Sequence, residues 1–222
     1  MYSMCFHNAF IYYEQDAKAK LFNEEYGIGC DLTVVTMDGY DRKMYYEDTG
    51  MLWIMPSPNF PTVETSITYN STCIFEGTNI EEGRGTTAPF QLVGAPFIDP
   101  YQYAEKLNNL KLPAVYFRPA YFKPTFSKYP NIDCAGVEVH VLDRNKYEAV
   151  KVGFAMLQVI RDMYPNEFEV TPPYKEGMHT MLAFNIANEK IINNEMSLED
   201  QFKLIDNDTK AFKEVRKKYL LY

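Results

Sequence analysis

The stretch CAGVEVHVLDR at residues 134–144 decides which kind of fold this chain can adopt. Its residues alternate in kind, with Val137, Val139 and Val141 on one side and Glu138, His140 and Leu142 on the other. Alternation with a period of two predicts a strand, and β-branched valines suit a strand that packs one face on a core. His140 is therefore expected on the face opposite the valines.

Strand and helix patterns continue on both sides of this stretch. FQLVGAP at 90–96 and AVYFRP at 114–119 also resemble strands, and adjacent strands with short connections favour antiparallel pairing. Further strands are predicted at 31–37, at 42–48, at the start of LWIMPSPNFPTVE (52–64) and at 72–75. Helices are predicted at 14–26, at about 62–69, from Asp99 to before Pro113, at 145–163, and from Ser197 to the C-terminus. The predicted fold class is α+β: a mixed, largely antiparallel sheet packed with helices, and a long C-terminal helix.

Composition excludes several classes of partner. The chain has 222 residues, of which 46% are hydrophobic, enough to bury a core without disulfides or metal. Net charge is -8, and Lys and Arg form no basic face, so no nucleic acid partner is expected. No apolar run approaches the roughly 20 residues that span a bilayer, and the N-terminus lacks the pattern of a signal peptide. As written, the chain is expected to have no membrane partner and to remain in the cytoplasm.

Cysteines and histidines show no spacing typical of a metal site. They are Cys5, Cys30, Cys73, Cys134, His7, His140 and His179. Two disulfides could form by any of three pairings, but Cys73 and Cys134 lie in strand-like apolar runs, which favours buried free thiols. No metal and no cofactor are expected.

The segment FEGTNIEEGRGTTAPF at 75–90 gathers three glutamates, one arginine and three glycines between two predicted strands. Such a loop fits recognition of a polyol, because glycines let the backbone approach a ligand. Glu76 and Glu82 could also supply the two carboxyl groups that glycoside hydrolysis needs. The alternative is that Glu81 and Glu82 are solvated and that Arg84 pairs with one of them at the surface, worth under about 1 kcal/mol.

Aromatic residues are concentrated in FRPAYFKPTFSKYP at 117–130. Tyr and Phe in a loop can offer a flat apolar surface with a polar tip, which suits sugar rings and peptides, or they can cap the core. His140 ends a strand close to Asp143 and Arg144, a common place for functional groups. A lone histidine on a strand is more often structural, so both interpretations remain open.

Several motifs together closely resemble the C-terminal half of the NamZ-like exo-β-N-acetylmuramidases, a family long known only as a domain of unknown function. They are MPSPNFPT (55–62), EGTNIEEGRGTTAPFQLVGAP (76–96), LPAVYFRPAYFKPTFSKY (112–129), CAGVEVHVLDR (134–144) and VRKKYLLY (215–222). The resemblance covers residues 21–222 and implies one NamZ-like C-terminal domain there. Residues 1–20 do not resemble the family and form an atypical N-terminal segment.

The resemblance implies a glycosidase that acts on peptidoglycan. In that family, a Rossmann-like N-terminal domain and a smaller α+β domain form a cleft that removes N-acetylmuramic acid from non-reducing ends. The resemblance leads us to expect that the Rossmann-like half is absent here and that it holds the catalytic glutamate, so no residue of this chain is assigned that role. A truncated or mis-started reading frame, with a Rossmann-like partner encoded upstream, would explain the difference, and relatives are often exported.

The implied ligands are N-acetylmuramic acid and peptidoglycan-derived muropeptides. N-acetylmuramic acid carries a lactyl carboxylate, and an arginine fork suits a carboxylate, so Arg84 or Arg118 is the expected clamp. The substrate-binding residues expected in total are Glu76, Asn79, Glu82, Arg84, Arg118 and His140. This chain is then the substrate-binding half of a muramidase and not catalytic alone. The alternatives are a stand-alone muropeptide-binding or carbohydrate-binding module and an inactive gene fragment.

Overall fold

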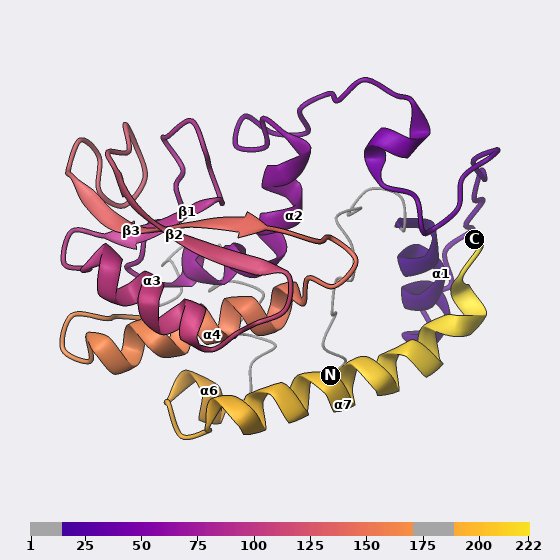
Figure 1. Ribbon diagram of the computed structural model, residues 1–222. Helices are drawn as coiled ribbons and strands as arrows, with labels where there is room; N and C mark the ends of the chain where they lie inside the picture. Colours follow the sequence, from indigo (N-terminus) through magenta and orange to yellow (C-terminus); the bar gives the residue numbers. More distant parts are fainter. Residues whose placement is uncertain (1–14, 171–188) are drawn as a thin grey trace.

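A three-stranded antiparallel sheet organises the larger body of the molecule (Figure 1). The computed structural model describes residues 15–170 and 189–222. Strand β3 (Cys134–Val141) lies between β1 (Leu92–Ala95) and β2 (Val115–Phe122). Val137 and Val139 are buried in the core, whereas His140 is partly exposed on the other face. The prediction that the valines and His140 lie on opposite faces of this strand is therefore confirmed.

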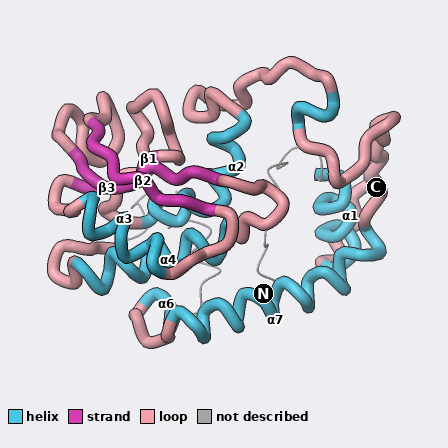
Figure 2. The backbone as a smooth tube through the Cα atoms, in the orientation of Figure 1, coloured by secondary structure: helices cyan, strands magenta, loops and turns pink. Residues whose placement is uncertain are grey.

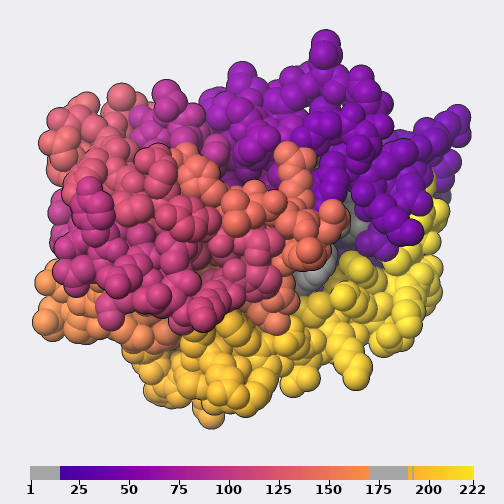
Figure 3. Space-filling view, in the orientation of Figure 1, coloured from indigo at the N-terminus to yellow at the C-terminus, as the bar shows by residue number. Residues whose placement is uncertain are grey.

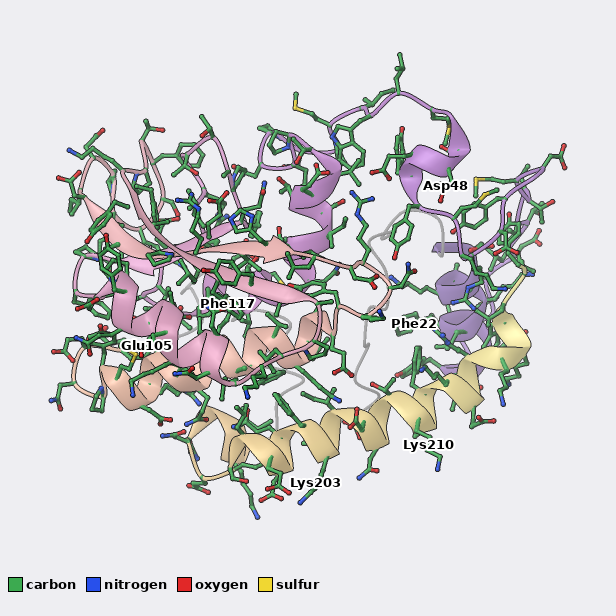
Figure 4. All side chains as sticks on the ribbon, viewed as in Figure 1. Phe22, Asp48, Glu105, Phe117, Lys203 and Lys210 are labelled. Atoms are coloured by element: carbon green, nitrogen blue, oxygen red, sulfur yellow. The ribbon has the colours of Figure 1, made fainter. Side chains whose placement is uncertain are left out.

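Helices cover the valine face of the sheet. Helix α3 (Pro100–Asn109) packs against β2 and β3, and α4 (Ala149–Met163) packs against α3 and against α2 (Val63–Thr72) (Figure 1). In Figure 4, Phe117 is labelled on β2 above these helices, and it is fully buried. The Asn108 amide of α3 holds that strand, because it donates to the Phe117 carbonyl (2.8 Å) and accepts from the Phe117 amide (3.1 Å).

Helix α7 (Leu198–Arg216) connects this body to helix α1 (Gln15–Glu25) at the other side of the molecule (Figure 1). The short helices α6 (Glu189–Ile192) and η3 (Lys217–Tyr219) precede and follow it. Ser197 caps α7 by accepting from the amide of Asp200 (3.2 Å). Beyond the far end of α7, the Tyr219 hydroxyl donates to Glu25 (2.7 Å). The long C-terminal helix predicted from the sequence is confirmed.

Two of the predicted strands, at 31–37 and 42–48, do not form. The chain between α1 and α2 is almost entirely loop, interrupted by the 3-10 helix η1 (Tyr46–Thr49) (Figure 2). The predicted strand at the start of 52–64 is also absent. A strand needs a neighbouring strand to satisfy its main chain, and no strand pairs with these segments in the described residues.

The predicted strand at 72–75 is wrong for a different reason. Helix α2 continues to Thr72, and the 3-10 helix η2 (Cys73–Gly77) follows it. Hydroxyl groups bond back along α2: Thr68 donates to the Glu64 carbonyl (3.1 Å) and Thr72 to the Thr68 carbonyl (3.0 Å). Packing of this threonine-rich helix on α4 outweighs the strand preference of its residues.

Cys30, Cys73 and Cys134 are free thiols, as expected for the last two, and Cys5 lies outside the described residues. Burial raises the pKa of Cys73 and of Cys134 to about 12, with smaller contributions from nearby carboxylates. None of the described helices is both long and apolar enough to cross a bilayer.

Candidate functional site

Glu81 and Glu82 of the loop before β1 are buried, which rules out the alternative that they are solvated. Glu81 and Glu82 each have 0% of their surface exposed. The main chain of Glu81 pairs with Gly94 of β1 in both directions, through bonds of 2.8 and 3.0 Å. This pairing draws the loop onto the edge of the sheet and carries both side chains inward.

Glu82 binds two cations at once. One carboxylate oxygen accepts from Nε of Arg84, and the other accepts from Nζ of Lys128 at 2.5 Å. The Arg84 guanidinium also lies 3.4 Å from the Glu76 carboxylate. Arg84 therefore already binds two carboxylates of its own loop, and only 31% of its side chain is exposed. Both features leave it less available to bind the carboxylate of a ligand.

Lys128, which sequence reasoning missed, is the centre of this cluster. Besides Glu82, its ammonium donates to the carbonyls of Phe75 (2.7 Å) and Ile80 (2.5 Å), and its backbone amide donates to Glu81 Oε2 (3.0 Å). Its ion-pair partner is 46 positions away in sequence, beyond the reach of any local pattern. The only feature of the sequence that could have drawn attention to Lys128 is its position in the aromatic segment 117–130.

The cluster contains three carboxyl groups and two cations, and it shifts several pKa values. Burial raises the pKa of Glu81, and the neighbouring Glu82 adds to this while Lys128 opposes it. Burial likewise raises the pKa of Glu76, although Arg84 opposes the shift. Oε1 of Glu81 has no hydrogen-bond partner in the structure as described. Glu81 therefore binds a proton more readily than an exposed glutamate does.

The same cluster joins two loops that are far apart in sequence. Both rise at the same end of the sheet, one before β1 and one between β2 and β3 (Figure 1). The amide and hydroxyl of Thr125 donate to the Gly85 carbonyl (2.9 and 3.0 Å), and the Tyr129 hydroxyl donates to the Asn79 carbonyl (2.8 Å). Gly85 has a φ of 80°, and a Cβ there would lie 2.7 Å from backbone atoms of Phe126. Only glycine allows this approach.

An open hollow of about 640 Å³ lies where these two loops meet the segment before α2. It is lined by Pro58, Asn59, Gly85, Thr86, Thr87, Leu92, Tyr121, Phe122, Lys123, Thr125 and Phe126. Aromatic rings, hydroxyl groups, one side-chain amide and one lysine surround the same space. Such a lining suits a ring with an apolar face and polar edges, such as a sugar.

Arg118 is not one of the residues that line the hollow, but it lies on the same face of the sheet as Leu92, which does. Glu138 is opposite both Arg118 and Leu92 in register, so the three side chains share one face. Arg118 pairs with Glu138 through Nε (3.1 Å) and Nη2, and Nε2 of His140 is 3.4 Å from the same carboxylate. With 57% of its side chain exposed, Arg118 is the more accessible of the two arginines proposed as clamps.

The structure divides the predicted site residues between two places. Glu76, Glu82 and Arg84 lie in the buried cluster behind the hollow, and Arg118 and His140 lie on the sheet face beside it. The Asn79 amide is occupied elsewhere, since it donates to the Glu167 carbonyl (2.7 Å) and accepts from the Glu169 amide (3.0 Å). Within residues 15–170 and 189–222, no group of three His, Cys, Asp or Glu side chains could hold a metal ion.

Comparison with known proteins gives two adjoining family matches. The model described as "Exo-beta-N-acetylmuramidase NamZ, C-terminal" matches residues 67–222, and the corresponding N-terminal model matches residues 17–64. A Bacillus subtilis (strain 168) protein, "Peptidoglycan beta-N-acetylmuramidase NamZ", is 47% identical over 204 residues, which are 92% of this chain and 49% of that protein.

Solved structures agree with these matches. A DUF1343 family protein from Bacteroides fragilis superposes with a TM-score of 0.78 at 28% identity, over 93% of this chain and 55% of that one. A second protein of that family and species, at 24% identity and a TM-score of 0.59, shares the fold over 93% of this chain and 54% of its own. The chain thus spans about half the length of the relatives it matches.

Proposed function

The chain belongs to the NamZ exo-β-N-acetylmuramidase family, and from this membership we propose that it is the substrate-binding half of such an enzyme. The observation that carries the proposal is the hollow between residues 121–126 and the loop residues Gly85, Thr86 and Thr87, with an exposed arginine, Arg118, on the sheet face that Leu92 of the lining also occupies. Its ligand is the non-reducing N-acetylmuramic acid of peptidoglycan fragments. The Bacillus subtilis relative is named for action on peptidoglycan, which supports that choice of sugar.

Arg118 is the proposed clamp for the lactyl carboxylate. Its guanidinium is already oriented by Glu138 on the sheet face that borders the hollow, and arginine binds carboxylates through paired N–H groups. The aromatic rings of Tyr121 and Phe126, both exposed, would cover an apolar face of the sugar. Arg84 and Glu82 would not contact the sugar. Their ion pair would instead hold in position the neighbouring residues Gly85, Thr86 and Thr87, which line the hollow.

The carboxylates of the loop are poorly placed to hydrolyse a glycosidic bond. Glu81 and Glu82 are fully buried, and a general acid must come within hydrogen-bond reach of the leaving oxygen. Glu76 is partly exposed, but Arg84 is its partner. The catalytic acid is therefore proposed to lie on the N-terminal domain of the family, outside the part that residues 17–64 match here, so that this chain binds without turnover.

A chromogenic N-acetylmuramic acid glycoside tests this division. The purified chain should release no chromophore above the uncatalysed rate. Release that is lost in Glu76→Gln but retained in Glu105→Gln, an exposed position on α3, would place the chemistry in this half and overturn the proposal.

The main alternative is a stand-alone carbohydrate-binding module, which the aromatic and hydroxyl-bearing lining of the hollow would also suit. The two functions differ in what a catalytic partner adds. If the chain is half of an enzyme, co-expression with an N-terminal domain of the family should give turnover of the chromogenic glycoside. If the chain is a stand-alone binding module, co-expression should leave it able to bind sugar but give no turnover.

A further inference from the structure

We propose that Asn59 is a specificity-determining residue of the hollow, whose side-chain amide forms a hydrogen bond with the acetamido group of the bound sugar. This role rests on the proposed function, because it takes the hollow as the sugar site, and it names the residue that selects an N-acetylated sugar. It is separate from the role of Arg118, which concerns the lactyl carboxylate.

Several polar side chains that line the hollow already have partners within the protein. The Thr86 hydroxyl forms bonds of 2.6 and 3.1 Å with two main-chain groups of its own loop. The Thr125 hydroxyl donates to the Gly85 carbonyl (3.0 Å), and the Lys123 ammonium pairs with Asp133 (3.0 Å). These groups would have to give up a bond in order to bind a ligand.

Three other polar side chains of the lining have no partner among the described residues. They are those of Asn59, Thr87 and Tyr121. Thr87 and Tyr121 are exposed, so water can satisfy their hydroxyl groups. Asn59 is half-buried, and its side-chain amide has no protein group to replace the water that a ligand would displace. A ligand in the hollow is therefore the partner that this amide lacks.

A tight turn presents Asn59 to the hollow. The Phe60 amide donates to the Ser57 carbonyl (2.9 Å), and the main-chain N–H of Asn59 donates to the Ser57 hydroxyl (3.3 Å). Pro58 comes directly before Asn59, at the turn position that suits its fixed φ. A side chain held on a rigid turn loses less freedom when it binds a ligand.

Phe60 fastens this turn to the body that forms the rest of the hollow. The centroid of its ring lies 4.9 Å from that of Tyr69 in α2 and 5.6 Å from that of Phe90 in the loop before β1. Its carbonyl accepts from the Trp53 indole (3.2 Å). Figure 3 shows the purple segment before α2 bordering the magenta loop before β1 at the surface. The turn is thus fixed relative to the opposite wall of the hollow.

An acetamido group matches this wall in polarity and in shape. A side-chain amide both donates and accepts, and the acetamido group offers a carbonyl and an N–H. Its methyl group would contact apolar side chains of the same lining, such as Pro58 and Leu92. A hydroxyl in its place ends closer to the sugar ring and has no methyl group, so it would leave the Asn59 amide unpaired.

Isothermal titration of the full chain tests this role with two ligands. They are N-acetylmuramic acid and its analogue that keeps the lactyl carboxylate but has a hydroxyl in place of the acetamido group. The parent chain should bind N-acetylmuramic acid at least tenfold more tightly, because a site that bonds a polar group discriminates against an analogue that lacks it. Asn59→Leu, which removes the amide at similar size, should abolish this preference.

The matched control is Asn207→Leu, at an exposed position of α7, which should keep the preference for the acetamido group. Asn59→Leu should still prefer N-acetylmuramic acid over N-acetylglucosamine, because Arg118 is intact. A preference for the acetamido group that survives in Asn59→Leu, or that is lost equally in Asn207→Leu, would overturn the assignment of Asn59.

NMR spectroscopy gives a second readout that does not depend on the affinity of a variant. The side-chain amide signals of Asn59, identified by their absence in Asn59→Leu, should shift when N-acetylmuramic acid is added to the parent chain. Those of Asn70, whose amide already donates to the Ser66 carbonyl (3.2 Å), should not. Asn59 signals that stay unmoved at saturating sugar would overturn the assignment.

The titrations also distinguish this role from the proposed function. If the parent chain binds N-acetylmuramic acid and its hydroxyl analogue equally, the sugar site stands and the role of Asn59 is refuted. If the parent chain binds neither ligand, the proposed function is refuted, and the role of Asn59 fails with it.

Discussion

At the scale of single residues, the ion pair between the partly exposed Lys128 and the fully buried Glu82 joins two loops that line the hollow. Glu82 is out of contact with water, and the lysine also satisfies two carbonyls of the preceding segment. Removing one partner of such a pair leaves a buried charge with less compensation, which is far more costly than removing a surface pair. Lys128 should therefore matter more than any exposed lysine of this chain.

Replacing Lys128 by methionine tests this difference. Lys128→Met should lower the free energy of unfolding by about 3 kcal/mol, because Glu82 keeps Arg84 but loses its second cation. The matched control is Lys123→Met in the same loop, whose exposed pair with Asp133 should be worth under about 1 kcal/mol. Urea denaturation measures both; equal losses would show that the buried pair has no special role.

The raised pKa of Glu81 predicts that the stability of the protein depends on pH. Burial raises its folded pKa above the ordinary value of 4.5, so between these two values the folded state binds more protons than the unfolded state. Its contribution to stability is then greatest below about pH 4.5 and is lost as pH rises through the folded pKa.

The comparison that isolates this effect is between the parent chain and Glu81→Gln. The free energy of unfolding of the parent relative to the variant should increase as pH falls from about 7 towards about 4.5. A parent that loses stability relative to Glu81→Gln on acidification would refute the raised pKa.

At the scale of elements, the sequence predicted those whose signal is local. Capping residues located helices α3 and α7, since Asp99 and Ser197 accept from the amides expected of N-caps, and valine alternation located β3. Strands were wrongly predicted at 31–37 and 72–75 because propensity does not report whether a partner strand is present or whether a helix continues by packing. The sequence drew attention to the loop 75–90, whose role in binding stays a prediction, but it could not reveal the burial of Glu81 and Glu82 against Lys128, which comes from a distant segment.

The contact between α2 and α4 is a packing feature that the sequence did not reveal. A Cβ on Gly153 would lie 2.3 Å from the Ser71 carbonyl oxygen, so the two helices approach as closely as their main chains allow. Gly153→Ala should lower the free energy of unfolding by about 1–3 kcal/mol through overpacking, although alanine favours a helix by about 1 kcal/mol.

A thermal or urea unfolding experiment checks this, with Lys210→Ala on the outer face of α7 (Figure 4) as the control that should stay within about 0.5 kcal/mol. A stabilised Gly153→Ala would mean that helix propensity outweighs the close contact.

At the scale of the whole molecule, the sheet body and helix α1 lie at opposite sides, joined along one edge by α7 (Figure 1). The residues that line the hollow come from the sheet body and from the segment before α2, so the proposed sugar binding belongs to that side of the molecule. Sugar recognition is thus expected from this chain alone, and turnover only with its partner.

Isothermal titration of the full chain with N-acetylmuramic acid, compared with N-acetylglucosamine, which lacks the lactyl carboxylate, tests the central claim most directly. We predict at least tenfold tighter binding of N-acetylmuramic acid, about 1.4 kcal/mol, because a charge-assisted bond to Arg118 is worth about 1.5–3 kcal/mol. Arg118→Ala should abolish that preference, and Lys146→Ala, an exposed lysine paired with Asp143, should retain it. Equal affinity for the two sugars, no binding of either, or a preference that survives in Arg118→Ala would contradict the claim.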